Sequence, residues 1–264
     1  MDTGCRWAGW AGWQNWVGVA CGWLVAVSLL APPAGEGTAR AEQNAPDLRH
    51  FWRFDTEKSG ESPAGFTAGT VVAGANSEGQ AGTWKIEPDP QTPSLPNRLT
   101  QEASCPSAGA DAPCFQLLLA NGLTYEYPDL TVRLKTAAEG SRGRAGLVFG
   151  AKDTRNFYAA IVDLAADVLE VVHVVDGQVS LIGRGAVKRK PTPWHSLRLQ
   201  HNTILSKDFL EISFDGKIVF THLDKRLGTG QIGLVTRGDA PIWFDNFDAV
   251  QLFSQRPLSP PAAY

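Results

Sequence analysis

Polar, charged and aromatic side chains that could hold a small polar ligand recur through the second half of the chain. They are Arg133, Asp153, Arg155, Asn156, Tyr158, His173, Arg237 and Trp243. If several share one concave face, an aromatic ring (Tyr158 or Trp243) would stack on a pyranose, and the charged and amide groups would bond its hydroxyls. The alternative is that each is an ordinary exposed strand residue or turn former, since Asp and Asn favour turns for local reasons.

Two further carboxylates predict a metal site. Asp55 and Asp245 each follow a phenylalanine, in segments that we expect to form neighbouring strands. Carboxylate and carbonyl oxygens are the ligands that Ca²⁺ prefers, so a structural calcium ion at the rim of the fold is one interpretation. The other is that each carboxylate caps a turn or accepts backbone hydrogen bonds. The histidines lack zinc-site spacing, and no cofactor is required.

No residue pattern identifies a catalytic centre. The chain has no Gly-x-Ser-x-Gly sequence, the usual setting of a nucleophilic serine in hydrolases of one large class. His173 lies among valines, where an isolated histidine also fits as a packed sheet residue. We therefore name no catalytic residues and leave open whether the chain is an enzyme. If it is one, Arg133, Asp153 and His173 are the first candidates.

Cys105 and Cys114 bracket a turn-rich segment whose ends can meet. In an oxidising compartment such a pair forms a disulfide, and closing this ring would stabilise the fold by about 2–3 kcal/mol. A metal-binding or redox pair is the alternative, although the spacing is not Cys-x-x-Cys.

The N-terminus is typical of an export signal. Val17–Leu30 is an apolar run, and Ala39-Arg-Ala41 offers a small-residue cleavage site. The run is shorter than the roughly 20 residues that span a bilayer, so export is favoured over a membrane anchor. We expect a signal peptide at 1–41, a linker at 42–49, one domain at 50–253 and a disordered tail at 254–264. Cleavage near Ala41 would release a periplasmic or extracellular protein that does not span a membrane.

Charge excludes one class of partner. The formal net charge is -3 and the pI is about 6.0, so the basic footprint of a nucleic-acid-binding protein is missing. Lys188-Arg189-Lys190 is the only dense basic run, and we interpret it as a solvated loop.

The elements that must position these residues are strands. Short segments with period-two alternation recur about every 8–12 residues, and the pairs Asp176-Gly177 and Asp215-Gly216 are typical two-residue hairpin turns. This spacing predicts an all-β sandwich or barrel, and no stretch after the leader has a convincing helical period. We expect the first and last strands to pair, with Phe54 and Phe247 in one core. The expected strands are His50–Phe54, Thr83–Glu87, Asn97–Glu102, Phe115–Ala120, Leu130–Thr136, Gly146–Gly150, Phe157–Asp163, Leu169–Val175, Val179–Gly183, Trp194–Gln200, Leu210–Phe214, Lys217–Phe220 and two within Gln231–Val250.

Ten short motifs follow one another in a recognisable order. They are Trp52–Asp55, Pro63–Phe66, Gly82–Trp84, Asp129–Arg133, Gly146–Phe149, Asp153–Tyr158, Trp194–His195, Phe214–Gly216, Gly233–Leu234 and Phe244–Phe247. The chain thus resembles bacterial exported domains of the concanavalin A-like, laminin-G-like jelly-roll superfamily, often labelled 3-keto-disaccharide hydrolase or family-sixteen glycoside hydrolase-like.

This resemblance implies an all-β, antiparallel two-sheet β-sandwich of the concanavalin A-like jelly-roll type, and a glycan or cell-envelope component as partner. The Glu-x-Asp-x-x-Glu spacing of jelly-roll glucanases, which sets acid and nucleophile across the glycosidic bond, is missing. We therefore expect a non-catalytic carbohydrate- or partner-binding module. One alternative is a hydrolase or lyase acting on 3-keto-glycosides, and a second is a structural adhesion domain.

Overall fold

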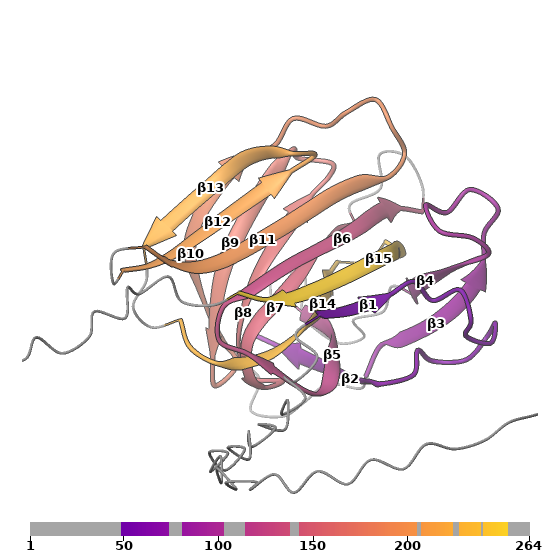
Figure 1. Ribbon diagram of the computed structural model, residues 1–264, viewed down its shortest axis with the longest axis horizontal. Helices are drawn as coiled ribbons and strands as arrows, with labels where there is room; N and C mark the ends of the chain where they lie inside the picture. The colour runs from indigo at the N-terminus through magenta and orange to yellow at the C-terminus, as the bar shows by residue number, and fades with distance from the viewer. Residues whose placement is uncertain are drawn as a thin grey trace, which may run out of the picture. The chain divides into compact units, whose positions relative to one another are not determined.

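Two antiparallel sheets lie face to face in the computed structural model of the protein (Figure 1). The structure describes residues 49–73, 81–102, 114–137, 143–204, 207–223, 227–238 and 240–252. Fifteen strands and no helix occur in these ranges. The prediction of an all-β, two-sheet sandwich is therefore confirmed.

The first sheet has eight strands in the order β13-β12-β11-β6-β15-β4-β3, with β1 also paired to β15. In Figure 1 it forms the near layer. Its strands are β1 (Arg49–Trp52), β3 (Thr83–Pro88), β4 (Asn97–Glu102), β6 (Pro128–Thr136), β11 (His195–Ile204), β12 (Lys207–Phe214), β13 (Lys217–Leu223) and β15 (Ile242–Gln251).

The second sheet has seven strands in the order β10-β9-β8-β7-β14-β5-β2. They are β2 (Phe66–Val72), β5 (Cys114–Tyr125), β7 (Arg144–Asp153), β8 (Asn156–Asp163), β9 (Val168–Val175), β10 (Gln178–Ala186) and β14 (Gly230–Arg237). The connection from β10 to β11 carries the chain from this sheet to the first.

The last strand, β15, is central to the eight-stranded sheet. One of its edges pairs with β6 along nearly its whole length. Its other edge is shared, because residues 242–244 pair with β4 and residues 247–250 pair with β1. The predicted pairing of the first and last strands is confirmed, and Phe54 and Phe247 both belong to the core between the sheets, as expected.

A β-bulge in β15 allows two of its phenylalanines to be buried on the same face of the sheet, whereas a regular strand would place them on opposite faces. Phe244 and Phe247 are three residues apart, a spacing that places side chains on opposite faces of a strand. The register with β6 shifts between Asp245 and Asp248, and Asn246 has a positive φ of 49°. This extra residue turns both rings into the core, where each is fully buried.

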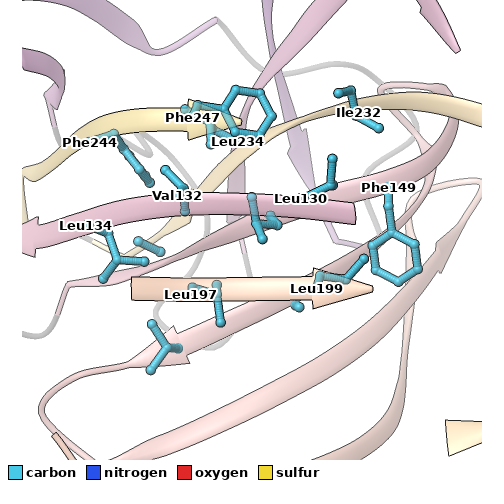
Figure 2. Close-up of a cluster of buried hydrophobic side chains, with 14 of the residues drawn as sticks. Leu130, Val132, Leu134, Phe149, Leu197, Leu199, Ile232, Leu234, Phe244 and Phe247 are labelled. Atoms are coloured by element: carbon cyan, nitrogen blue, oxygen red, sulfur yellow. The ribbon is translucent and has the colours of Figure 1, made fainter. Parts of the chain in front are cut away.

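The core between the sheets is built from alternate residues of the central strands. Figure 2 shows Leu130, Val132 and Leu134 of β6 in line above Leu197 and Leu199 of β11. Ile232, Leu234 and Phe149 enter the same cluster from the seven-stranded sheet. Each of these side chains is at most 1% exposed, so the hydrophobic effect of this layer holds the sheets together.

A second apolar cluster covers the opposite, outer face of the seven-stranded sheet. Leu117 and Leu119 of β5 belong to it, whereas the alternating Leu118 faces the first core. Phe115 of β5 and Phe157 of β8 also belong, with ring centroids only 5.9 Å apart. These strands are three steps apart in the sheet, about 14 Å if the sheet were flat.

The seven-stranded sheet is therefore curled around its outer face. A second close approach agrees, because a Cβ added at Gly69 in β2 would lie 2.5 Å from Cγ2 of Thr154 in the β7–β8 turn. The concave side is filled by the protein's own side chains, and several of them are less than 1% exposed.

Strand β2 was not expected from the sequence, whereas every expected strand has a counterpart. The predicted signal peptide (1–41) and the tail (254–264) lie outside the described residues. Within the ranges that are described, no helix is long and apolar enough to cross a membrane.

Candidate functional site

A cavity of about 760 Å³ opens at one end of the sandwich. Its walls come from the last residues of β6, the β8–β9 turn, the β10–β11 connection and the first residue of β11. We call it the end pocket. Leu164 and Val187 supply apolar wall, His195 supplies an imidazole, and the charged side chains are Lys135, Asp167, Lys188, Arg189 and Lys190.

His195 is the most firmly positioned polar side chain of the end pocket. Its Nδ1 atom lies 2.8 Å from Oδ2 of Asp215, and its ring stacks on Phe214 with centroids 5.3 Å apart. A carboxylate accepts hydrogen bonds, so Nδ1 carries the proton of this contact. In the neutral ring Nε2 is then an acceptor, and among the described residues the one hydrogen bond of this ring is the one at Nδ1.

Asp215 also anchors the wall of the pocket. Its carboxylate accepts hydrogen bonds from the backbone N–H of Lys190 and of Ser196, each at 2.9 Å. Burial alone would raise the pKa of Asp215, but these two bonds and the one from His195 outweigh it and hold the pKa below its ordinary value of 3.8. The carboxylate is therefore ionised at neutral pH, and it fixes both the His195 ring and the β10–β11 connection.

The charge of the end pocket is mostly positive. Among its described lining residues four side chains are cationic and one, Asp167, is acidic, and Oδ1 of Asp167 forms an ion pair with Nε of Arg189 at 2.7 Å. The basic run 188–190 is exposed, as expected for a solvated loop, and it also forms part of a cavity wall. Sequence reasoning missed this site because its members are scattered from position 135 to position 215.

The eight predicted ligand-binding residues do not gather on one surface. Asp153, Arg155 and Asn156 form a turn beside the β9–β10 turn. Oδ1 of Asp153 accepts bonds from the Arg155 backbone at 2.7 Å and the Asn156 amide at 2.9 Å. Asn156 in turn accepts a bond from the backbone N–H of Asp176 at 3.0 Å. These polar groups join two hairpins to each other.

Tyr158 is buried in the core between the sheets, and the half-buried His173 packs against it. Their rings are stacked, with centroids 4.0 Å apart and planes 2° from parallel. Tyr158 is 5% exposed and also stacks on Phe149 of the core. One face of each ring is thus taken by the other.

Arg133 and Trp243 lie on the outer face of the eight-stranded sheet. The guanidinium of Arg98 is 3.6 Å from the Trp243 ring centroid, and the ammonium of Lys135 is 4.8 Å from it. These two cations come from β4 and β6, the strands on either side of Trp243. Arg133 donates to the carbonyl oxygen of Trp194 at 3.2 Å.

Arg237 lies on the other sheet, at the rim of its filled concave face. It pairs with Glu170 at 3.2 Å, and its guanidinium is 5.7 Å from the centroid of the Phe115 ring.

The two carboxylates of the predicted calcium site are brought together around Ser94. The Ser94 hydroxyl lies 2.9 Å from Oδ1 of Asp245 and 3.3 Å from Oδ1 of Asp55. Burial raises the pKa of Asp245, which also accepts bonds from Thr92 and from two backbone N–H groups. The described residues contain no cluster of three or more His, Cys, Asp or Glu side chains suited to a metal. The calcium ion stays a prediction.

Of the two cysteines in the predicted disulfide, the structure describes Cys114. Cys114 begins β5 and is 5% exposed. Cys105 lies outside the described residues, so the disulfide stays a prediction.

The fold is shared with carbohydrate-related proteins of known structure. The carbohydrate-binding module CBM66 from Bacillus subtilis matches with a TM-score of 0.50 and 20% identity, covering 72% of this chain and 98% of that one. LamA from Z. galactanivorans, in complex with laminaritriose and laminaritetraose, matches with a TM-score of 0.50 and 8% identity, covering 76% of this chain and 98% of that one. No family model and no curated protein matches the sequence. The likeness confirms the predicted concanavalin A-like jelly-roll fold.

Proposed function

We propose that this chain is an exported module that binds a carbohydrate in the end pocket without transforming it. The observation that carries the proposal is the cavity itself. Its volume of about 760 Å³ falls in the range of small-ligand sites. Apolar wall from Leu164 and Val187 lies beside one oriented polar side chain, His195, and that combination suits a ring with hydroxyl groups on its edges.

The fold supports this proposal without deciding it. CBM66 is by its name a carbohydrate-binding module, and LamA is bound to oligosaccharides. One fold hosts many functions, so the argument for this chain rests on its own pocket. The predicted leader at 1–41 and the predicted pairing of Cys105 with Cys114 support an oxidising compartment outside the cytoplasm.

Thermal unfolding of the purified protein with a panel of oligosaccharides tests the proposal. A ligand present at 100 times its dissociation constant stabilises the fold by about 2.7 kcal/mol, which is an easily measured shift. The shift should disappear in a variant that narrows the pocket, Ala165→Trp, and should persist in Ala186→Trp. Both alanines are exposed, and only Ala165 lines the cavity. A panel that gives no shift would leave the chain with a structural role.

One observation favours a second function, an enzyme acting on glycosides. A histidine whose Nδ1 is bonded to a buried carboxylate is positioned for proton transfer through Nε2, and His195 presents that arrangement at a cavity. The resemblance noted above makes 3-keto-glycosides the first substrates to try. Chromatography of the incubated oligosaccharides distinguishes the two functions. New products that are lost in His195→Gln would establish the enzyme, and unchanged oligosaccharides that still stabilise the protein would establish the binding module.

A further inference from the structure

The end pocket is lined by several cationic side chains although the protein as a whole has a negative net charge. The chain carries a formal net charge of -3, yet Lys135, Lys188, Arg189 and Lys190 all line this one cavity. They come from two separate segments, the end of β6 and the β10–β11 connection. The positive field here is therefore a local property of the cavity, and it attracts anions to this end of the molecule.

The segment that carries three of these cations is fixed to the fold on both sides. The backbone N–H of Val187 donates to the carbonyl oxygen of Asp167 at 2.9 Å. The backbone N–H of Lys190 donates to the carboxylate of Asp215 at 2.9 Å, and that of Thr192 donates to the carbonyl oxygen of Lys190 at 2.8 Å. The side chains of residues 188–190 thus extend from a backbone whose position is set beside the cavity.

Lys135 is held from a different direction. Its ammonium group lies 4.8 Å from the ring centroid of Trp243 and 5.9 Å from that of Trp194. Both aromatic rings attract the cation through their π faces, which limits where the charge can move. Among the described lining residues, Asp167 is the one carboxylate, and it is already paired with Arg189.

We infer that the end pocket selects an anionic carbohydrate, one that carries carboxylate or sulfate groups. The inference rests on the proposed function and specifies its ligand class. The ring of such a ligand lies against Leu164 and Val187, a hydroxyl bonds to Nε2 of His195, and the anionic groups pair with Lys135 and the cations of residues 188–190. Nothing in this arrangement requires a covalent step.

Calorimetric titration of the purified protein with matched ligands tests the inference. One pair is an oligogalacturonide and its methyl ester, which differ in charge at equal length. The other is a sulfated dextran oligosaccharide and its unsulfated parent. We expect the acidic member of at least one pair to bind tenfold or more tightly than its neutral partner. The pair that shows the difference tells whether carboxylate or sulfate is recognised. Raising the salt concentration should lower the affinity for the acidic ligand and leave the affinity for the neutral ligand unchanged.

Charge reversal at single lysines locates the site. Lys190→Glu and, separately, Lys188→Glu should each lower the affinity for the acidic ligand tenfold or more. Lys58→Glu is the control, since Lys58 is exposed in the β1–β2 connection and pairs with Glu61 outside the pocket. All three side chains are exposed, so the variants should fold, which circular dichroism checks.

The outcomes separate this inference from the proposed function. Equal binding of acidic and neutral ligands would overturn the inference and leave carbohydrate binding in place. The inference would also be overturned if Lys58→Glu lowered the affinity for the acidic ligand as much as Lys190→Glu does. The acidic ligand would then be attracted by the charge of the whole protein and not by the cations of the end pocket. No binding by any ligand would overturn both.

Discussion

The imidazole of His195 and the carboxylate of Asp215 are bonded at 2.8 Å although one begins β11 and the other lies in the turn between β12 and β13. Asp215 adopts a positive φ of 50°, and the glycine after it has a φ of 81°. Asp-Gly is the usual sequence of such a turn, and the same pair occurs at Asp176-Gly177. At position 215 the turn residue also fixes the wall of the end pocket, because its carboxylate accepts hydrogen bonds from His195 and from the backbone of Lys190.

Asp215→Asn should destabilise the protein in a pH-dependent way. Asparagine also tolerates a positive φ, so the turn should survive while the charge is lost. The folded pKa of Asp215 is below its unfolded value of 3.8. Its contribution is therefore complete above 3.8 and is lost as the pH falls through the folded pKa. We expect a loss of about 1–3 kcal/mol near pH 7, shrinking toward zero in acid. Urea unfolding at a series of pH values measures it.

The control for this experiment is Asp176→Asn in the equivalent turn. Asp176 is exposed, and only its backbone groups are seen to take part in hydrogen bonds. An equal pH dependence in both variants would contradict the assignment of the effect to the His195 contact.

Gly146→Ala should separate β7 from β8. A Cβ at this position would lie 1.8 Å from the backbone carbonyl oxygen of Ala160, and a backbone atom cannot rotate away as a side chain can. We expect a loss of about 1–3 kcal/mol or more in the free energy of unfolding. Gly228→Ala is the matched control, because no atom lies within 4 Å of its added Cβ. Comparable melting temperatures for the two variants would show that the sheet adjusts more easily than this geometry implies.

The sequence predicted strands well where one face is buried and the other is polar. Leu130–Thr136 alternates in this way, and β6 contains it. β2 was missed because its sequence, FTAGTVV, has small residues where a clear apolar alternation would be. Gly69 is small for a reason outside the strand, since Thr154 from the β7–β8 turn occupies the space that a side chain would need. A contact between residues this far apart in the chain cannot be predicted from the local sequence of β2.

Thr92→Val should weaken the link between the segment before β4 and strand β15. The Thr92 hydroxyl donates to Oδ2 of Asp245 at 2.7 Å, and Asp245 is fully buried. Valine keeps the shape but removes the donor, which leaves a buried carboxylate with less compensation. The expected loss is about 1–3 kcal/mol in the free energy of unfolding, measured by urea titration. Thr221→Val on the exposed face of β13 should change it little, and equal losses would argue against the Asp245 contact as the cause.

Loss of the predicted disulfide should lower stability as well. Cys105→Ser is expected to cost about 2–3 kcal/mol, because the chain-entropy model assigns that much to closing a ring of this length. Melting temperatures with and without reducing agent measure it, and mass spectrometry of the alkylated protein counts the free thiols. If reduction leaves the melting temperature of the parent protein unchanged, the pair does not stabilise the fold.

The candidate site was less predictable than the fold. Tyr158 and Trp243 have the right chemistry for stacking on a sugar, but Tyr158 packs in the core and Trp243 lies beside Arg98 and Lys135. Conversely, the role of His195 depends on Asp215, twenty residues later in the chain, and no local pattern indicates that the two side chains meet. Residue type indicates what a side chain can do, and which side chains meet is decided by strand order and register.

The curling of the seven-stranded sheet has a consequence for how this protein can change over time. Both faces of that sheet are committed to packing, so a substitution there disturbs a core whatever it does for a ligand. The end pocket is built from strand ends and connections, where sequence can vary at lower structural cost. New ligand preferences can therefore arise by replacing residues of the β10–β11 connection while the two sheets stay as they are.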